Sequence, residues 1–384
     1  MLNFRRITTQ KRFIPQIDGL RFVAISSVVF FHIYSSLEGR GAIPVPVPLN
    51  LDLPKRGVEL FFAISGFILG VPFASHYILK APKVNLKQYF LRRLTRLEPP
   101  YFLSFPAWAL MQWIAIRRPF SSMAPHLLAH CFYLHNFIYG AFPGAINTVA
   151  WSLEVEVQFY TLVPLLSLIF AISNPTVRRG VILAAMAVLG VAGSPLYRTV
   201  HFHYFIGYFI SFFLAGFLVC DFYITRKDWK PSFIWDAFAF CLWPLVWVPA
   251  QHVLHVILPF AIVILYLAAF RGRICSAIFS NPWITDIGGM CYSIYLFHFL
   301  VIYAVKRVTA YWHIGGNFWA FFALQSVLMW IAILLCCGTF FLLIERPCMD
   351  RDWPKKLWNR MKALTSAQPI RQPETEPNPS APHV

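Results

Sequence analysis

The feature that most constrains this chain is a series of apolar stretches, each about 17–25 residues long, which recurs over most of its 384 residues. A helix of that length can cross the ~30 Å hydrocarbon core of a membrane. The stretches cover ten ranges: 20–37, 57–79, 98–116, 151–173, 180–197, 204–224, 232–250, 252–270, 289–308 and 316–343. The sequence therefore predicts an all-α integral membrane protein, a bundle of about ten transmembrane helices.

One further stretch, 126–142, is apolar but contains His126, His130, His135 and Asn136. These polar residues favour an interfacial helix or a re-entrant loop over an eleventh span.

The composition agrees with a membrane protein and excludes several other classes. Hydrophobic residue types make up 58% of the chain and charged types 13%, whereas soluble domains have about half and about a quarter. This balance excludes a disordered chain, a nucleic-acid-binding domain and a secreted disulfide scaffold. Of the 33 Lys and Arg, 25 lie on the inner side and 8 on the outer side if the N-terminus is cytoplasmic. We therefore expect both termini in the cytoplasm of a multi-pass protein of the plasma (inner) membrane, with a net charge of +17 that needs no nucleic-acid partner.

The chain divides into three predicted regions. These are a basic cytoplasmic N-terminus (1–13), a transmembrane domain (14–348) and a cytoplasmic, largely disordered, Pro-rich tail (349–384). Asp18 and Arg21 interrupt the first apolar run and no cleavage site follows it, which indicates an uncleaved first span rather than a signal peptide. The eight cysteines have no C-x-x-C spacing, and most lie in apolar runs, so no metal site is predicted.

Charged and titratable residues inside spans are costly and mark candidate functional sites. In the first span, His32 follows Arg21 by eleven residues, which is about three helical turns and ~16 Å along the axis. This spacing predicts an imidazole near the middle of the membrane above Arg21, with Asp18 one turn below. His32 is a candidate proton acceptor. The alternative is a histidine bonded to a neighbouring helix, with Arg21 as an interfacial anchor.

Two other spans carry candidates of the same kind. His298 lies ~13 Å into the ninth span, at a depth similar to His32, with Tyr295 one turn below it. Glu156 lies ~7 Å inside the outer boundary of the fourth span, where it needs a partner or a water-filled cavity. We expect Glu154 to be solvated at the rim. Structural packing is the alternative for both His298 and Glu156.

A basic segment on the predicted cytoplasmic side could hold the phosphates of a nucleotide-like cosubstrate. Its cations are Lys80, Lys83, Lys87, Arg92, Arg93 and Arg96. Membrane orientation alone would also place them there. Ser65 and Gly66 lie in the middle of the second span, where small residues favour close helix packing; a nucleophilic role for Ser65 is not expected.

These pieces, in this order, resemble the acyltransferase-three family of ten-span bacterial membrane enzymes, over residues 14 to 348. The resemblance rests on Ile17-Asp18-Gly19-Leu20-Arg21 with His32, Gly57 to Gly66, Arg93-Leu94-Thr95-Arg96, Trp151 to Tyr160, Tyr292 to His298, and Glu345-Arg346-Pro347. The chain departs from many relatives at Val157, where a second acidic residue is common, and at Phe297, where Trp is common.

The resemblance implies O-acylation, and most often O-acetylation, of a sugar hydroxyl on a glycan or lipid-linked sugar such as lipopolysaccharide. The implied cosubstrate is a cytoplasmic acyl-CoA, usually acetyl-CoA, with no bound cofactor. The resemblance also implies that His32, Arg21, Glu156 and His298 are catalytic residues. It implies that Arg92, Arg93 and Arg96 bind the donor. Asp18, Trp151, Tyr295 and Glu345 are expected to support them.

Some relatives carry a fused hydrolase-like domain. This sequence contains none, so we expect the chain to act alone or with a separate partner. The main alternative function is a proton-coupled transporter of a small solute or sugar, because intramembrane Arg, His and Glu also line transport paths.

Overall fold

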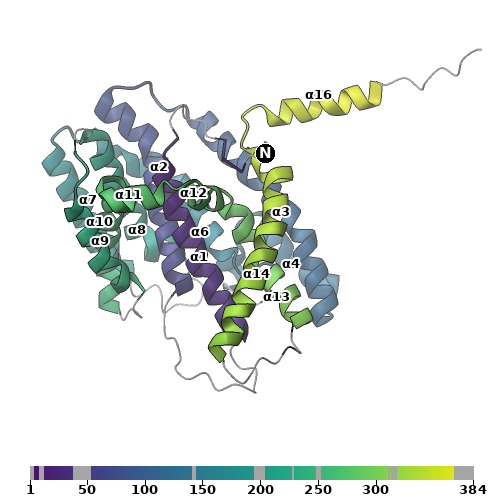
Figure 1. Ribbon diagram of the computed structural model, residues 1–384. Helices are drawn as coiled ribbons and strands as arrows, with labels where there is room; N and C mark the ends of the chain where they lie inside the picture. The colour runs from purple at the N-terminus through teal and green to yellow at the C-terminus, as the bar shows by residue number, and fades with distance from the viewer. Residues whose placement is uncertain are drawn as a thin grey trace, which may run out of the picture.

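The structure is a computed structural model that describes residues 4–7, 13–37, 53–140, 144–193, 204–226, 229–247, 252–309, 312 and 318–366. Every regular element within these residues is a helix. The long helices run side by side in one bundle, with their connections at its two ends (Figure 1). The predicted all-α class is therefore confirmed for the described residues of the chain.

Nine long helices make up most of the bundle. They are α1 (Pro15–Leu37), α2 (Leu53–Leu79), α3 (Leu86–Ile116), α6 (Trp151–Leu166), α7 (Pro175–Gly193), α8 (Ile206–Thr225), α10 (His252–Arg271), α13 (Cys291–Thr309) and α14 (Phe318–Phe340). The shorter elements are α4 (Phe120–Cys131), α5 (His135–Tyr139), η1 (Ser167–Ala171), α9 (Phe233–Val246), α11 (Arg273–Phe279), α12 (Pro282–Gly289), η3 (Phe341–Glu345), α15 (Arg346–Cys348) and α16 (Trp353–Ser366).

Among the described residues, seven helices are long and apolar enough to cross a membrane, or eight if α10 and α11 form one span bent by 85°. Helix α9 has only 14 residues, fewer than the ~20 that a full crossing needs. Helix α3 has 31 residues, but its first half contains arginines, and Pro99, Pro100, Pro106 and Gln112 interrupt its apolar sequence. The membrane character is thus confirmed, while the count of ten spans and the cytoplasmic termini stay predictions.

Glycines bring α2 and α8 together at the centre of the bundle. A Cβ atom on Gly66 would overlap the carbonyl oxygen of Phe213, and one on Gly216 would overlap that of Ala63. Without side chains at these positions the two backbones approach closely. The ring of Phe213 stacks on that of Phe62, with centroids 4.7 Å apart, just beside this contact. The prediction that small residues near Gly66 allow close packing is confirmed.

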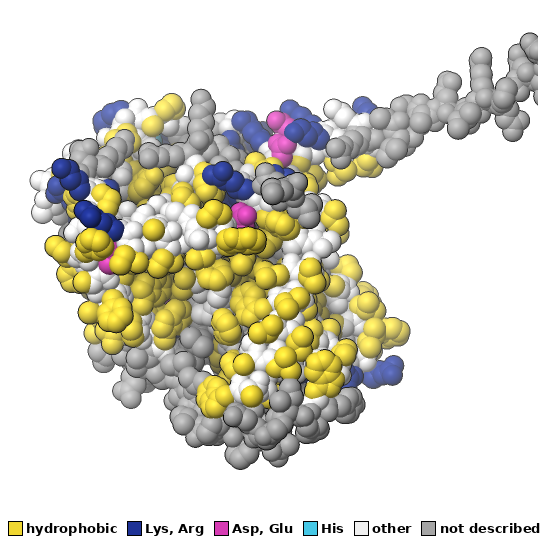
Figure 2. All heavy atoms as spheres, viewed as in Figure 1, with side chains coloured by type: hydrophobic (Ala, Val, Ile, Leu, Met, Phe, Trp, Pro, Cys, Tyr) yellow, Lys and Arg dark blue, Asp and Glu magenta, His cyan; other side chains and the backbone are white. Residues whose placement is uncertain are grey.

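Charge and hydrophobicity are separated along the bundle. In Figure 2 hydrophobic side chains cover the middle of the visible face, and most of the visible Lys and Arg gather at the end that holds the described N-terminal residues. Some charges buried in the bundle have partners of opposite charge: Asp221 of α8 binds both Arg178 and Arg179 of α7. Pairing offsets a portion of the cost of burying these charges.

The segment after the bundle, which we predicted to be a largely disordered tail from residue 349, contains a regular helix. Helix α16 occupies residues 353–366 and projects from the same end of the bundle as the N-terminal residues (Figure 1). Residues 367–384, where we expected disorder, lie outside the described residues, as do most residues of the predicted basic N-terminus, 1–13.

Candidate functional site

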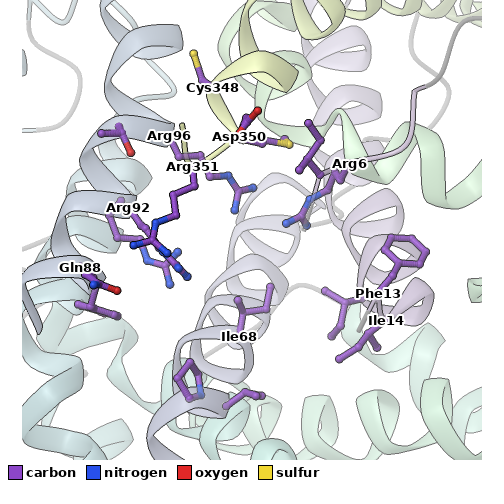
Figure 3. Close-up of a pocket in the computed structure, with 18 of the residues that line it drawn as sticks. Arg6, Phe13, Ile14, Ile68, Gln88, Arg92, Arg96, Cys348, Asp350 and Arg351 are labelled. Atoms are coloured by element: carbon purple, nitrogen blue, oxygen red, sulfur yellow. The ribbon is translucent and has the colours of Figure 1, made fainter. Parts of the chain in front are cut away.

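A basic hollow of about 310 Å³ opens where the N-terminal residues, the start of α3 and the segment after α15 meet. Five arginines line it: Arg6, Arg92, Arg93, Arg96 and Arg351. Figure 3 shows several of these guanidinium groups reaching into the hollow, with Phe13 and Ile14 on one side and Gln88 on the other. We call this the outer hollow, because it lies nearer the surface of the bundle than a second hollow described below. It combines an excess of cations with apolar and amide surfaces, a combination that suits a phosphorylated ligand with a flat ring.

Local helix geometry explains why these arginines share the hollow. Helix α3 begins after Asn85, whose side-chain oxygen accepts a hydrogen bond of 3.0 Å from the Gln88 N–H. Position 96 follows position 93 by three residues and position 92 by four, so the Arg96 side chain lies beside both of the others on the helix surface. The guanidinium of Arg93 lies 5.3 Å from the ring centroid of Tyr89 and 5.9 Å from that of Tyr160, which holds it by cation–π attraction. The predicted donor-binding arginines therefore converge in one hollow.

A second, inner hollow of about 120 Å³ lies deeper in the bundle and shares Ile68, Arg93 and Arg96 with the outer one. Arg21, Ser65, Glu156 and Tyr295 also line it. Arg21 donates to Asp18 over 2.5 Å, and Arg6 donates to the same carboxylate oxygen over 2.8 Å. The sequence-predicted residues Arg21, Asp18 and Glu156 are thus connected to the arginines of α3 through adjacent hollows.

Glu156 has a partner that the sequence analysis missed. The Ser65 hydroxyl donates a hydrogen bond of 2.5 Å to Glu156 Oε1, and both side chains line the inner hollow. A carboxylate inside the bundle gains a charge-assisted hydrogen bond in this way. The sequence had assigned Ser65 to helix packing alone, and its position beside Gly66 was the signal that favoured packing.

Tyr295 connects the inner hollow to the two predicted histidines. Its hydroxyl donates to the Val149 carbonyl and lies 3.0 Å from the Ser152 hydroxyl. One turn further along α13, His298 Nδ1 lies 2.8 Å from the Ile294 carbonyl oxygen and 3.0 Å from that of Tyr295. Because a carbonyl only accepts, Nδ1 carries the proton. His298 Nε2 is buried and has no hydrogen-bond partner in the described chain, so its lone pair is available.

His32 packs against protein. Its ring centroid lies 5.2 Å from that of His298 and 5.2 Å from that of Phe299. The two predicted histidines, 266 positions apart in the numbering, therefore form a pair, as the similar depth predicted for both requires. Neither imidazole is among the described residues that line the two hollows; Tyr295 lies between the inner hollow and the pair.

The other two predicted supporting residues hold elements together. Buried Glu345 accepts hydrogen bonds from the Ser293 N–H (2.9 Å) and from the Ser293 hydroxyl, which joins η3 to α13. The Trp151 ring packs 4.3 Å from that of Tyr204, and the Trp151 carbonyl accepts a 2.9 Å hydrogen bond from Asn136. Both contacts agree with structural support, and neither side chain lines the two hollows as described.

The expectation for Glu154 was wrong. The residue is 1% exposed rather than solvated, and it accepts a 2.8 Å hydrogen bond from the Asn136 N–H because α5 folds over the start of α6. His130 Nδ1 lies 3.4 Å from Glu154 Oε1, and the sequence had not linked these residues. The signal was available in the polar residues of the 126–142 stretch.

His130, His135 and Glu154 bring candidate ligand atoms to within 4.8 Å of one another. The two imidazoles, however, stack face to face, with centroids 4.2 Å apart and planes 3° apart. Ring nitrogens coordinate a metal through lone pairs in the ring plane, so two parallel planes do not direct them at one point. The Ile146 N–H also donates to His130 Nε2 over 3.4 Å. This histidine cluster is therefore a network that fastens α4 and α5 to α6.

In structural terms the protein is a helical membrane bundle in which a basic hollow lies beside a buried polar site. The sequence model of the acyltransferase domain family matches residues 14–344. The chain therefore belongs to this acyltransferase family, and the resemblance drawn from its motifs is confirmed. Its enzyme class is that of the acyltransferases.

Curated relatives agree with the family. The chain is 26% identical over 177 residues to peptidoglycan O-acetyltransferase OatA of Listeria monocytogenes, a match that covers 43% of this chain and 26% of the relative. It is 29% identical over 164 residues to O-acetyltransferase OatA of Staphylococcus aureus, covering 40% and 24%. The chain spans about a quarter of the length of these relatives. No solved structure matches it.

Proposed function

We propose that this chain is a membrane O-acyltransferase that moves an acyl group, acetyl in the simplest case, from cytoplasmic acyl-CoA to a sugar hydroxyl of a cell-surface or exported glycan. The observation that carries the proposal is the pair of hollows that share Arg93 and Arg96. One is basic enough for the donor phosphates, and the other extends towards the polar groups around Glu156 and Tyr295.

The donor end of the proposal follows from charge and shape. Coenzyme A carries phosphates and an adenine ring at one end and the thioester at the end of a long flexible arm. Arg92, Arg93 and Arg96 bind the phosphates, since guanidinium groups match phosphate oxygens in geometry and charge. The arm then passes Arg93 and Arg96 into the inner hollow. The concentration of Lys and Arg at that end of the bundle supports its placement in the cytoplasm (Figure 2).

The chemical step uses the histidine pair. His32 removes the proton from the acceptor hydroxyl as its oxygen attacks the thioester carbonyl carbon. The new C–O bond forms, the C–S bond breaks, and the thiolate leaves with the proton that His32 held. General-base catalysis of this kind contributes about 10²–10⁴-fold. A variant of the mechanism passes through an acyl-histidine intermediate.

We assign supporting roles in this step to His298 and Glu156. His298 packs against His32 with its proton fixed on Nδ1 by two carbonyl groups, so it orients the base. Glu156, held by Ser65, places a hydrogen-bond acceptor in the inner hollow where a substrate hydroxyl can bind. The names of the relatives favour a glycan acceptor such as peptidoglycan, and lipopolysaccharide or a lipid-linked sugar has the same reacting group.

Mass spectrometry of surface glycans from cells with and without the protein tests this function. We expect an acyl mass, 42 Da for acetyl, on glycans only when the protein is present, and consumption of acetyl-CoA by proteoliposomes that contain the protein and the glycan. The proposal is contradicted if the glycans are identical in the two strains and liposomes move the sugar without consuming acyl-CoA, which is the behaviour of a transporter.

A further inference from the structure

Helix α16 differs from the rest of the molecule in that it leaves the bundle. It starts beside the outer hollow, where the Trp353 indole N–H donates a 3.0 Å hydrogen bond to the Thr95 carbonyl of α3. Asp350 accepts hydrogen bonds from the Lys356 ammonium (2.5 Å) and the Asp352 N–H (2.9 Å), and these bonds lower the pKa of Asp350. From this fixed start the helix projects sideways, across the direction of α14 (Figure 1).

The helix has an apolar side that stays exposed. Leu357, Trp358 and Met361 are 49%, 58% and 51% exposed. Trp358 and Met361 follow Leu357 by one and four residues. The three side chains therefore lie within an arc of about 100° around the helix. A large hydrophobic side chain exposed at each of these positions marks a surface for an apolar partner.

Positive charge flanks this apolar side. Lys355 and Lys362 fall within about 60° of Trp358 around the helix, and the Lys362 ammonium lies 5.3 Å from the Trp358 ring centroid. The sequence Trp353–Ser366 contains no Asp or Glu. An amphipathic helix with lysines beside its apolar side is typical of helices that lie in the interface of an anionic membrane.

We infer that α16 binds the surface of the membrane in which the bundle is embedded, with Leu357, Trp358 and Met361 among the acyl chains and its lysines on anionic phosphate headgroups. The direction of the helix fits this placement, because a helix that runs across α14 lies along the membrane plane. Tryptophan prefers the headgroup level, and a lysine beside it reaches the phosphates while its stem stays on apolar surface. Bound in this way, α16 keeps the outer hollow, which Asp350 and Arg351 line, at the level of the headgroups.

Hydrogen–deuterium exchange on the full chain, reconstituted at one copy per nanodisc, tests the inference. Discs of phosphatidylcholine alone are compared with discs that also contain phosphatidylglycerol, which presents anionic headgroups on both faces. We expect slower exchange of the amides in 353–366 in the anionic discs. The difference between the two kinds of disc should shrink at high salt. It should correspond to about fivefold tighter binding of α16 to the anionic surface for each lysine that contacts it. Since both disc faces are alike, the result does not depend on the proposed cytoplasmic placement or on acyl transfer.

Matched variants separate the possible outcomes. The double variant K355E/K362E should remove the difference between the two lipids, and L357S/W358S should speed exchange in both. Lys230→Glu, which reverses an exposed charge in the segment between α8 and α9, should change neither. Equal exchange in the two lipids, or protection that survives both double variants, would overturn the inference. With one copy per disc, a second chain cannot cause protection.

Discussion

At the scale of single residues, the hydrogen bond from Ser65 to Glu156 is the contact that most changes the account of the site. Ser65 belongs to α2 and Glu156 to α6, so the bond fixes a carboxylate on one helix from another. Both side chains line the inner hollow. A carboxylate held in this way presents a constant direction to a bound hydroxyl, which is what a substrate-positioning group requires.

Ser65→Ala should therefore lower kcat for acyl transfer about tenfold or more, the effect of losing one hydrogen bond to a charged group. Donor affinity should stay unchanged, because the phosphates bind at the other hollow. Ser104→Ala is the matched control, since Ser104 is a buried serine whose hydroxyl donates only to the Tyr101 carbonyl of its own helix. Steady-state kinetics on the purified variants, with coenzyme A binding measured alongside, check this. Equal losses in both variants would show that Ser65 serves packing alone.

Arg93→Ala should weaken coenzyme A binding by about tenfold to a hundredfold, because a hydrogen bond between charged partners contributes about 1.5–3 kcal/mol. Isothermal titration calorimetry with free coenzyme A measures this directly. Lys87→Ala is the matched control: Lys87 is an exposed cation on the same helix that does not line either described hollow. Unchanged affinity in Arg93→Ala would remove Arg93 from the donor site.

The sequence predicted Glu156, His298 and the α3 arginines because charged or titratable groups in apolar segments stand out without any structure. It did not predict the role of Ser65, since a serine next to a glycine in a span suits packing equally well and only its partner decides. Glu154 was misplaced for a related reason: its burial depends on α5 folding over the start of α6, which no local pattern encodes.

At the scale of elements, the α2–α8 contact shows how small residues build the site. Gly66 follows Ser65 directly, and its missing side chain lets α8 approach α2 at the Phe213 carbonyl. The same close approach fixes the rotation of α2 and so directs Ser65 towards α6. Gly66, which allows the helix contact, and Ser65, which binds Glu156, are therefore successive residues of one helix.

Gly66→Val should destabilise the folded bundle by about 1–3 kcal/mol or more, because the added side chain meets backbone that cannot move aside. A fall in the thermal unfolding midpoint of the detergent-purified protein checks this. Gly180→Ala offers a control, since a Cβ there meets no atom within 4 Å. Equal midpoints for Gly66→Val and Gly180→Ala would show that the α2–α8 contact is looser than described.

Long apolar stretches predicted where the main helices lie, since length and hydrophobicity alone determine a membrane-spanning helix. They did not predict how these helices end or bend. The fourth stretch, 151–173, forms α6 and then tightens into η1 at Ser167, and α10 bends by 85° into α11 at Gly272. Such breaks depend on contacts with other elements: the Asp236 side chain, for example, accepts hydrogen bonds from the Arg273 and Cys275 N–H groups and caps α11 from α9.

At the scale of the whole molecule, the separation of charge is the feature that relates the site to the membrane. The outer hollow opens at the end of the bundle where Lys and Arg gather (Figure 2), beside the described N-terminal residues and the start of α16 (Figure 1). Basic residues stay on the cytoplasmic side of bacterial membranes. This arrangement supports the proposed access of a soluble cytoplasmic donor to the outer hollow.

Cysteine accessibility tests this orientation. In a chain freed of its native cysteines, Lys83→Cys should react with a membrane-impermeant thiol reagent only after spheroplasts are permeabilised. Ser121→Cys, at the start of α4, should react in intact spheroplasts. Both positions are accessible in the structure, so labelling depends on the side of the membrane. The reverse pattern would place the basic hollow outside and exclude a cytoplasmic donor.

In the proposed mechanism, His32 receives the proton of the acceptor hydroxyl, and the acyl donor enters through the arginine-lined hollow. The most direct measurement compares transfer of radiolabelled acetyl groups from acetyl-CoA to glycan by wild-type and His32→Ala protein in the same proteoliposomes. If His32 is the general base, the variant inserts and binds coenzyme A as the wild type does, while transfer falls by at least about 10²-fold. Transfer by His32→Ala at a rate near that of the wild type would contradict the proposed mechanism.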